Sequence, residues 1–402
     1  IAAQLAGDPK ADLIAAGVAD ALGLGGSLGA TSEKIFWAAR RLFEAVARRR
    51  PLVVVFDDLQ WAEPTFLDLV EHVTDLSRDA PIMVLCMARP ELLDERPGWG
   101  GGKLNATSIL LEPLSEEETV ELITNLLSRA TLPPEAAARI AEATEGNPLF
   151  AEELLAMLIE DGLLRRDNGS WTVANELADL PVPPTIHALL AARLERLPDD
   201  ERALLAHASV EGAVFHRGAL DDLAPDSLVP TAERSLTSLV RRDLIRPEQA
   251  SVGGEEAFRF RHILIRDAAY RSLPKGLRAE LHERYAAWAV RTVGSRLDEF
   301  EEIVGYHLEQ AYRLLEELGA LDSDAEALAV RGAERLESAG RRAHARSDHT
   351  GAVSLLERAA ALLPDDHARR PRLLADLGAA LMEAGRLADA DEGLGDAGRL
   401  AA

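Results

Sequence analysis

The run Leu52-Val-Val-Val-Phe56, followed directly by Asp57 and Asp58, constrains the fold of this chain more than any other stretch. A continuous apolar run rich in β-branched residues, bounded by Pro51 and by an acid, is typical of a strand buried on both faces. Such strands occur in parallel sheets, whose strands are joined by helical crossovers. The run therefore predicts a parallel α/β core with an acidic pair at the carboxyl end of one strand.

The flanking segments extend this pattern. Apolar residues at helical spacing predict one helix over residues 32–49, and another is predicted over 66–76. A second buried strand is predicted at 81–87, and a third, shorter one at 109–111. Strand, helix, strand, loop and strand in this order indicate an α/β domain.

Beyond residue 114 the pattern changes to helices and one hairpin. Ser115 and Glu118 have the spacing of a capping box and predict the start of a helix. The predicted helices cover residues 115–129, 134–143, 148–161, 184–196, 199–208 and 230–242. A hairpin is predicted from two short runs, 244–249 and 257–261, with its turn at Gly253-Gly254. Helices, then a hairpin, then a helix is the order of a winged helix.

The remainder, from about residue 277, is predicted to be helical and contains a repeat. Small residues recur at a constant offset of 38: Gly340, Ala352 and Ala359 return as Gly378, Ala390 and Ala397. Small residues at these places allow paired helices to pack closely. A tetratricopeptide unit has about 34 residues, so the loop 364–371 would hold the extra four. The tail therefore predicts two degenerate helical repeats.

Composition limits the classes of function. The net charge of -24 repels phosphate backbones, so we expect no direct nucleic-acid contact, although helix 230–242 carries arginines. No apolar run approaches the roughly 18 residues that span a bilayer, and no membrane contact is expected. The single cysteine, Cys86, excludes an internal disulfide and fits a reducing, cytoplasmic location. The ten histidines show no spacing typical of a metal site.

The acidic pair is where chemistry is expected. The carboxyl end of a parallel strand faces the ligand crevice of an α/β sheet. Asp57 is placed to hold Mg²⁺ against the phosphates of a nucleotide, and Asp58 to orient or deprotonate an attacking water. From these residues alone, a plain turn that ends a strand explains the pair equally well.

The sequence that follows favours the functional interpretation. Asp-Asp-Leu-Gln-Trp-Ala-Glu-Pro, from Asp57, resembles the Walker B segment of STAND-type signalling ATPases, in the branch that accompanies adenylate cyclases and LuxR-type regulators. The resemblance implies that Asp57 serves Mg²⁺ and Asp58 serves hydrolysis. It also implies that Arg89, after the next predicted strand, senses the γ-phosphate. The alternative for Arg89 is a surface arginine at a strand exit.

Two further segments are similar to the same ATPases. Thr144-Glu-Gly-Asn147-Pro148-Leu-Phe resembles the segment that opens a lid helix, and the resemblance implies that Asn147 and Pro148 belong to the nucleotide site, with the proline packed on adenine. Phe258-Arg-Phe-Arg-His262 resembles the segment whose histidine contacts the β-phosphate of bound ADP. The alternatives are a capped helix for the first segment and a structural histidine for the second.

The phosphate-binding loop of the family is missing from the sequence before Asp57. Nothing in residues 1–56 fits Gly-x-x-x-x-Gly-Lys-Ser/Thr. Gly98-Trp-Gly-Gly-Gly-Lys103-Leu104 lacks the Ser/Thr and comes after the acidic pair, so it is interpreted as a loop. The first residue is Ile1 rather than Met, which we interpret as a sign of a missing start. We therefore expect the chain to lack ATPase competence alone.

The predicted fold is an incomplete α/β P-loop NTPase core over residues 1–114, an all-α lid over 115–183, a winged helix over 184–290 and a helical-repeat tail over 291–402. The predicted function is an ATP/ADP-binding signalling switch that uses Mg²⁺, binds protein partners through its tail and self-associates. The alternatives are the ATPase module of a LuxR-type transcription regulator and a non-catalytic interaction scaffold.

Overall fold

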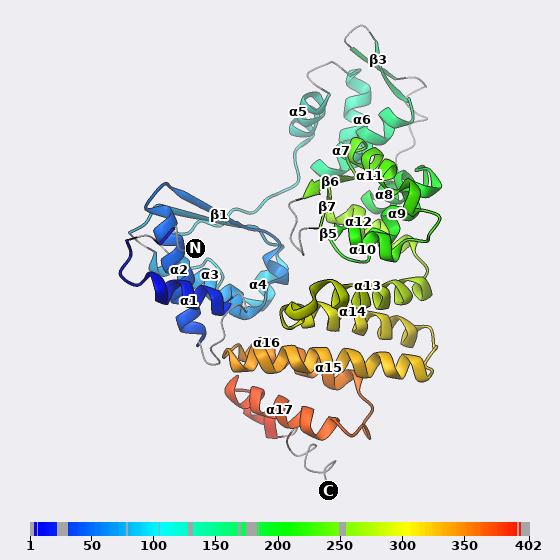
Figure 1. The fold of residues 1–402 in the computed structure, drawn as a ribbon. Coiled ribbons are helices and arrows are strands. Elements are labelled where there is room, and N and C mark those ends of the chain that lie inside the picture. Colours follow the sequence, from blue (N-terminus) through cyan, green and yellow to red (C-terminus); the bar gives the residue numbers. More distant parts are fainter. Residues whose placement is uncertain are drawn as a thin grey trace. The chain divides into compact units, whose positions relative to one another are not determined.

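The computed structural model is mostly helical, with a few short strands (Figure 1). It describes residues 4–5, 7–21, 31–77, 79–103, 105–127, 132–167, 170–173, 183, 185–248, 255–391 and 394. The chain divides into two compact units, Ile1–Ser108 together with Ala289–Ala402, and Ile109–Trp288. The division into four domains that the sequence predicts stays a prediction. Among the described helices, none is both long enough and apolar enough to cross a membrane.

The first part of unit 1 contains a two-stranded parallel sheet. Its elements are α1 (Ala11–Ala21), α2 (Ser32–Ala47), β1 (Leu52–Phe56), η1 (Leu59–Trp61), α3 (Pro64–Leu76), β2 (Ile82–Cys86) and α4 (Glu91–Glu95). Strands β1 and β2 pair in parallel, from Leu52 opposite Ile82 to Phe56 opposite Cys86. The two predicted strands and the helix between them are thus confirmed.

The prediction that these strands are buried on both faces is wrong. Burial alternates along β1 and β2, and the outward-facing side chains are 43–60% exposed: Val53, Val55, Met83 and Leu85. Helix α2 contacts both strands, and Leu67 of α3 joins a cluster with Phe56 and Cys86, whose side chains alternate with the exposed ones. An apolar run shows that both faces of a strand can be buried. In this sheet, however, described elements cover only one face.

The predicted third strand at residues 109–111 is also wrong. This segment has no strand hydrogen bonds, and its three side chains are 76–89% exposed: Ile109, Leu110 and Leu111. A strand exists only where a neighbouring strand satisfies its backbone groups. Within the described residues, no strand lies alongside this segment, so its apolar character does not produce one.

Unit 2 is built of helices and two small antiparallel sheets. Its elements are α5 (Glu116–Leu126), α6 (Pro134–Thr144), α7 (Pro148–Glu160), β3 (Leu164–Asp167), β4 (Ser170–Val173), α8 (Ile186–Glu195), α9 (Asp199–Ala208), β5 (Val214–His216), α10 (Arg217–Leu223), η3 (Val229–Thr231), α11 (Ala232–Arg241), β6 (Ile245–Glu248), β7 (Ala257–Phe260) and α12 (Ile263–Ser272). Every helix predicted in this region is present. The predicted capping box starts α5, because Ser115 Oγ accepts from Glu118 N and Glu118 Oε2 accepts from Ser115 N.

The predicted hairpin is present as β6 and β7, but two other pairings were not predicted. Strand β5 adds to β7, which gives a sheet in the order β5-β7-β6. Strands β3 and β4 pair antiparallel. Between them the sequence reads Asn168-Gly169, a strong hairpin signal that was not used in the prediction; these two residues lie outside the described part of the chain. The predicted turn at Gly253-Gly254 lies outside the described residues.

The tail of unit 1 is an array of long helices, drawn from yellow to red in Figure 1. After α13 (Lys275–Val293) and η4 (Gly294–Arg296) come α14 (Leu297–Glu317), α15 (Ser323–Ala345), α16 (His349–Leu362) and α17 (Arg370–Glu383). Each of α14 to α17 packs against the next. We call these four helices the helical array.

The predicted small residues do allow close packing in the array. A Cβ atom on Gly340 would lie 2.9 Å from Leu356 Cγ, so the α15 backbone approaches α16 as closely as a glycine permits. Ala352 and Ala359 are fully buried in the same cluster. The last residue of the predicted repeat, Ala397, lies outside the described residues.

Buried glutamates clamped by arginines are a second feature of the array. Three glutamates that are at most 7% exposed each pair with two arginines: Glu301 with Arg335 and Arg342, Glu309 with Arg313 and Arg358, and Glu337 with Arg341 and Arg369. Four of these arginines come from outside the helix of their glutamate, so the pairs join α14 to α15, α14 to α16, and α15 to the start of α17. A buried carboxylate needs such partners, because leaving it unpaired costs several kcal/mol.

Candidate nucleotide-binding site

The ends of β1 and β2 place three of the predicted site residues at one edge of the sheet. Asp57 and Asp58 follow the last residue of β1, and Arg89 lies three residues beyond the end of β2. The two strands are parallel, so both of these segments leave the sheet at the same edge. The structure therefore brings Asp57, Asp58 and Arg89 together, as the sequence predicts.

The backbone turns sharply at the acidic pair. Asp58 adopts the left-handed conformation, with φ 56° and ψ 37°, and its N–H donates to Asp57 Oδ1 over 2.9 Å. Aspartate tolerates this conformation better than most residues because its short polar side chain bonds locally. The turn directs the chain from β1 into η1, and leaves the carboxylates of Asp57 and Asp58 exposed.

Gln60 ties the two strand ends together, a role that we did not predict. Its Nε2 donates to Asp58 Oδ1 over 2.9 Å, and its Oε1 accepts from Arg89 N over 3.0 Å. A single side chain thus fixes both the orientation of the second acid and the path of the chain into Arg89. The glutamine belongs to the motif that we quoted, but only the position of β2 reveals its second partner.

These groups are exposed and suited to a hydrated cation with phosphate. The guanidinium of Arg89 makes no hydrogen bond or ion pair with any described residue, and the side chain is exposed. Carboxylate oxygens are the ligands that Mg²⁺ prefers, and a guanidinium fork matches phosphate oxygens. This edge of the sheet can therefore present two carboxylates and one guanidinium to a magnesium–phosphate group.

The second predicted segment forms a helix start in unit 2. Asn147 caps α7, with Oδ1 accepting from Phe150 N over 3.2 Å, and Pro148 is the first helical residue. Gly146 has φ +71°, and a Cβ atom there would lie 2.2 Å from Leu114 O. Gly146 is therefore required by a close backbone approach, while Asn147 and Pro148 remain exposed.

A pocket of about 600 Å³ lies beside this turn. It is lined by Leu114, Glu116, Thr119, Glu135, Ala138, Arg139, Ala141, Glu142, Glu145 and Gly146. Four of these are glutamates and one is an arginine, so the lining is acidic and unsuited to phosphate groups. Neither Asn147 nor Pro148 lines it, and this pocket does not coincide with the predicted adenine contact.

The third predicted residue, His262, joins β7 to α12. It is the N-cap of α12, and its Nδ1 accepts from Leu264 N over 3.2 Å. This bond fixes the side chain at the strand-to-helix junction, as the structural alternative predicts. A phosphate contact would have to use the other ring nitrogen, Nε2.

Neighbouring ion pairs connect α7 to the region around His262. Arg261 Nη2 lies 3.8 Å from Glu152 of α7. Deeper in the unit, Arg193 of α8 pairs with the buried Glu153 and with Glu160, both of α7. Burial raises the pKa of Glu153, and the Arg193 guanidinium opposes that rise. The predicted residues therefore form two groups: Asp57, Asp58 and Arg89 in unit 1, and Asn147, Pro148 and His262 in unit 2.

Three comparisons with known proteins gave matches. Residues 115–171, from α5 into β4, match a family model described as a domain of unknown function, DUF8739. The chain is 28% identical over 265 residues to the uncharacterized protein R02095 of Rhizobium meliloti (strain 1021); the match covers 63% of this chain and 24% of the relative. The chain thus spans about a quarter of the length of that relative.

One solved structure is similar over most of the chain. It is a Signal Transduction ATPase with Numerous Domains (STAND) protein with a tetratricopeptide repeat sensor, from Pyrococcus horikoshii. The TM-score is 0.44 and the sequence identity 16%, with 97% of this chain and 55% of that chain covered.

Proposed function

We propose that this chain is part of a nucleotide-dependent signalling switch of the STAND type, in the branch that accompanies adenylate cyclases. One observation carries the proposal. Asp57 and Asp58 stand at the carboxyl end of a parallel strand, and Gln60 links the second acid to the segment that holds Arg89. A turn that merely ends a strand does not require a bridge of this kind to the neighbouring strand.

Each residue of the sheet edge has a proposed role. Asp57 holds the Mg²⁺ ion of ATP or ADP, because its carboxylate is exposed at the ligand-facing edge. Asp58, held by Gln60, orients the water that attacks the γ-phosphate. Arg89 contacts the γ-phosphate and so distinguishes ATP from ADP.

The proposed contacts in unit 2 complete nucleotide recognition. The Asn147-Pro148 turn packs on adenine, and His262 reaches the β-phosphate of ADP through Nε2. The helix–hairpin–helix segment from α8 to α12 is the proposed winged helix. Its helix α11 carries arginines, but Arg242 pairs with Glu201 and Arg234 with Asp200, so we propose an internal role rather than DNA binding.

The helical array is the proposed sensor and the site of protein partners, including other copies of the chain. The turn between α15 and α16 contacts the segment that follows the acidic pair. Thr65 Oγ1 donates to Asp348 Oδ1 over 2.5 Å, and Ser32 Oγ donates to Ser347 O over 3.0 Å. A partner that shifts this turn would therefore act on the start of α3. We propose a cytoplasmic location, because the single cysteine, Cys86, can form no internal disulfide, as is usual in a reducing compartment.

Calorimetric titration of the purified chain with ATP, with and without Mg²⁺, tests the proposal. We expect weak binding that depends on Mg²⁺, since no phosphate-binding loop is recognised before Asp57. Asp57→Asn should weaken the Mg²⁺-dependent binding at least about tenfold, which is about 1.4 kcal/mol. The control is Asp94→Asn, which removes another exposed carboxylate of unit 1 and should leave binding unchanged. Equal binding by the wild type and Asp57→Asn would overturn the proposal.

A non-catalytic scaffold is the second candidate function. It is favoured by the missing phosphate-binding loop, because the backbone donors and lysine of such a loop have no substitute in residues 1–56. Under this alternative, the same titration shows no binding of ATP at any Mg²⁺ concentration. The ATPase module of a LuxR-type regulator would instead bind Mg²⁺–ATP as proposed and differ in its output domain.

A further inference from the structure

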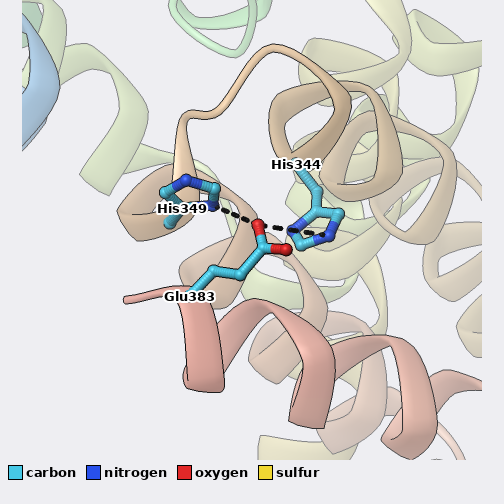
Figure 2. Close-up of side chains that lie close together, drawn as sticks. All are labelled: His344, His349 and Glu383. Atoms are coloured by element: carbon cyan, nitrogen blue, oxygen red, sulfur yellow. Dashed lines mark ion pairs between the residues drawn. The ribbon is translucent and has the colours of Figure 1, made fainter. Parts of the chain in front are cut away.

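The turn between α15 and α16 brings two histidines to the end of α17. His344 lies in the last turn of α15, His349 is the first residue of α16, and Glu383 is the last residue of α17. Figure 2 shows the two imidazoles and the carboxylate gathered around one point, with Glu383 between the histidines. One possible ligand atom from each of the three side chains lies within 4.8 Å of the others.

The distances within this cluster match those around a small transition-metal ion. Glu383 Oε2 lies 3.1 Å from His349 Nδ1 and 3.8 Å from His344 Nε2. Ligand atoms around tetrahedral zinc lie about 3.4 Å apart, because each is about 2.0–2.1 Å from the metal. The two observed distances bracket this value, so small side-chain rotations would complete the geometry.

The orientation of the histidines favours a shared ligand over a simple ion pair. His349 Nδ1 is a buried atom with no hydrogen-bond partner among the described residues, although Glu383 Oε2 is 3.1 Å away. For His344 the nitrogen that faces the carboxylate is Nε2, and its 3.8 Å distance from Glu383 Oε2 is too long for a hydrogen bond. In an ion pair the N–H points at the carboxylate, whereas metal ligands point at a common centre beside one another. Buried polar atoms without partners are otherwise costly.

The three ligand groups, two imidazoles and one carboxylate, favour zinc over magnesium or calcium. Two imidazoles and one carboxylate form the ligand set of many zinc sites that keep a fourth position for water. Mg²⁺ and Ca²⁺ prefer oxygen ligands alone, so the ion proposed at Asp57 is of a different class. The histidine side chains are 28–29% exposed and that of Glu383 is 56% exposed, so an ion can enter from solvent.

We propose that His344, His349 and Glu383 bind one zinc ion that fastens α17 to the turn between α15 and α16. The site cannot be recognised from sequence spacing, because its ligands are spread over three helices: the histidines are five positions apart, and Glu383 follows 34 positions after His349. The bound ion adds a further link to the ion pair of Arg341 with Asp376, which also joins α15 to α17. It acts on the turn that also contacts Ser32 and Thr65.

Zinc titration of the chelator-treated chain tests this proposal. The probe is zinc chloride, measured by competition with a chromophoric chelator. We expect one zinc ion per chain, with affinity reduced at least about tenfold by His344→Ala, by His349→Ala and by Glu383→Gln. The control is His187→Ala, which removes an exposed histidine of α8 and should leave the affinity unchanged. Zinc affinity that is equal in the wild type and the three cluster variants would overturn the proposal.

Cobalt substitution and thermal unfolding provide readouts that do not depend on affinity alone. Co²⁺ bound by the cluster should give the intense visible absorption of a low-coordinate ion in the wild type and in His187→Ala, but not in Glu383→Gln. Zinc should raise the unfolding midpoint of the wild type and leave that of Glu383→Gln unchanged. Glu383 is exposed at a helix end, so this variant should fold normally, which circular dichroism verifies. The spectrum of fully hydrated cobalt in the wild type would contradict the site.

Discussion

The β1–β2 sheet and the helical array belong to the same unit but differ in how far their side chains are buried and in how many partners their polar groups have. In the sheet, apolar residues such as Val53 and Met83 are exposed on one face, and the polar residues at its edge have few partners. In the array, a continuous cluster of apolar residues is almost completely buried, and a buried glutamate such as Glu309 has two arginine partners. Exposed acids are available to a ligand, whereas buried and partnered acids are committed to the fold.

Substitutions of the exposed acids at the sheet edge should therefore affect ligand binding, whereas substitutions of the buried acids in the array should affect stability. A polar group that is already satisfied by the protein contributes to folding and has nothing left to offer a ligand. The carboxylates of Asp57 and Asp58 have spare oxygen lone pairs, while that of Glu309 is fully used.

A matched pair of leucine truncations should give the largest effect. Leu336 of α15 is 0% exposed and lies so close to α14 that a Cβ on Gly305 would be 2.9 Å from its Cγ. Leu336→Ala should cost about 3 kcal/mol, because it leaves a cavity in a packed core. Leu85→Ala, on the exposed sheet face, should cost less than about 1 kcal/mol. Urea unfolding followed by circular dichroism measures both. Equal losses of unfolding free energy in the two variants would show that the sheet face is covered, and would contradict the difference between the sheet and the array.

A matched pair of glutamate substitutions should give the next largest effect. The Glu309 side chain is 3% exposed and accepts from Arg313 and Arg358 over 2.6–3.0 Å. Glu309→Gln should cost about 2 kcal/mol, because it weakens several charge-assisted hydrogen bonds in a buried place. Glu357→Gln removes an exposed pair with Arg386 and should cost less than about 0.5 kcal/mol. The same unfolding measurement applies, and a large loss in Glu357→Gln would contradict the distinction.

Lowering the pH should reduce the free energy of unfolding through His282, a buried histidine of unit 2. Like the buried glutamates of the array, it contributes to stability rather than to ligand binding. Burial, helped by Arg266 and Arg278, lowers the pKa of His282 to about 3, and the ring bonds to Tyr270 Oη over 2.8 Å. The unfolded chain, with a histidine pKa near about 6.5, takes up the proton first as pH falls. Stability is therefore complete above about pH 6.5, and this residue should cost about 2 kcal/mol between pH 7 and pH 5.

The variant His282→Gln isolates that contribution, since glutamine has no proton to gain in this range. Urea unfolding of the wild type and of His282→Gln at both pH values measures it. The wild type should lose about 2 kcal/mol more than the variant on acidification. Parallel losses in the two proteins would show that His282 is protonated when folded.

Polar substitution on the uncovered sheet face should have the smallest effect. Val53 and Val55 are 60% and 52% exposed, and threonine keeps their shape and strand preference. The double variant Val53→Thr, Val55→Thr should change the free energy of unfolding by less than about 0.5 kcal/mol. Unfolding in urea measures it. A loss of about 2 kcal/mol or more would mean that this face packs against apolar partners.

Local signals made much of the fold predictable. The Ser115–Glu118 spacing correctly marks the start of α5, and the Pro51-bounded apolar run correctly marks β1. Two features depend on distant partners and could not be read locally. The exposure of Val53 depends on what lies over the sheet, and the role of Gln60 depends on where β2 ends. The candidate edge of Asp57, Asp58 and Arg89 was predictable because parallel strands end on the same side.

The other failures have similar physical causes. Strand β5 has only three residues, Val214–His216, and exists because β7 offers it an edge. The segment 109–111 has better strand composition but lacks a described neighbour. Pairing partners, rather than composition, therefore decide whether a short apolar segment becomes a strand.

The left-handed backbone of Asp58 has a consequence for how this position can change during evolution. Glycine and asparagine adopt such a conformation readily, whereas alanine or valine would add strain of about 1 kcal/mol or more. A lineage that loses the acid through asparagine or glycine keeps the turn and the fold, and only the chemistry is lost. Most other replacements damage both together. Under the role proposed for Asp58, relatives that have lost hydrolysis but kept the domain should therefore carry Asn or Gly at this position far more often than Ala.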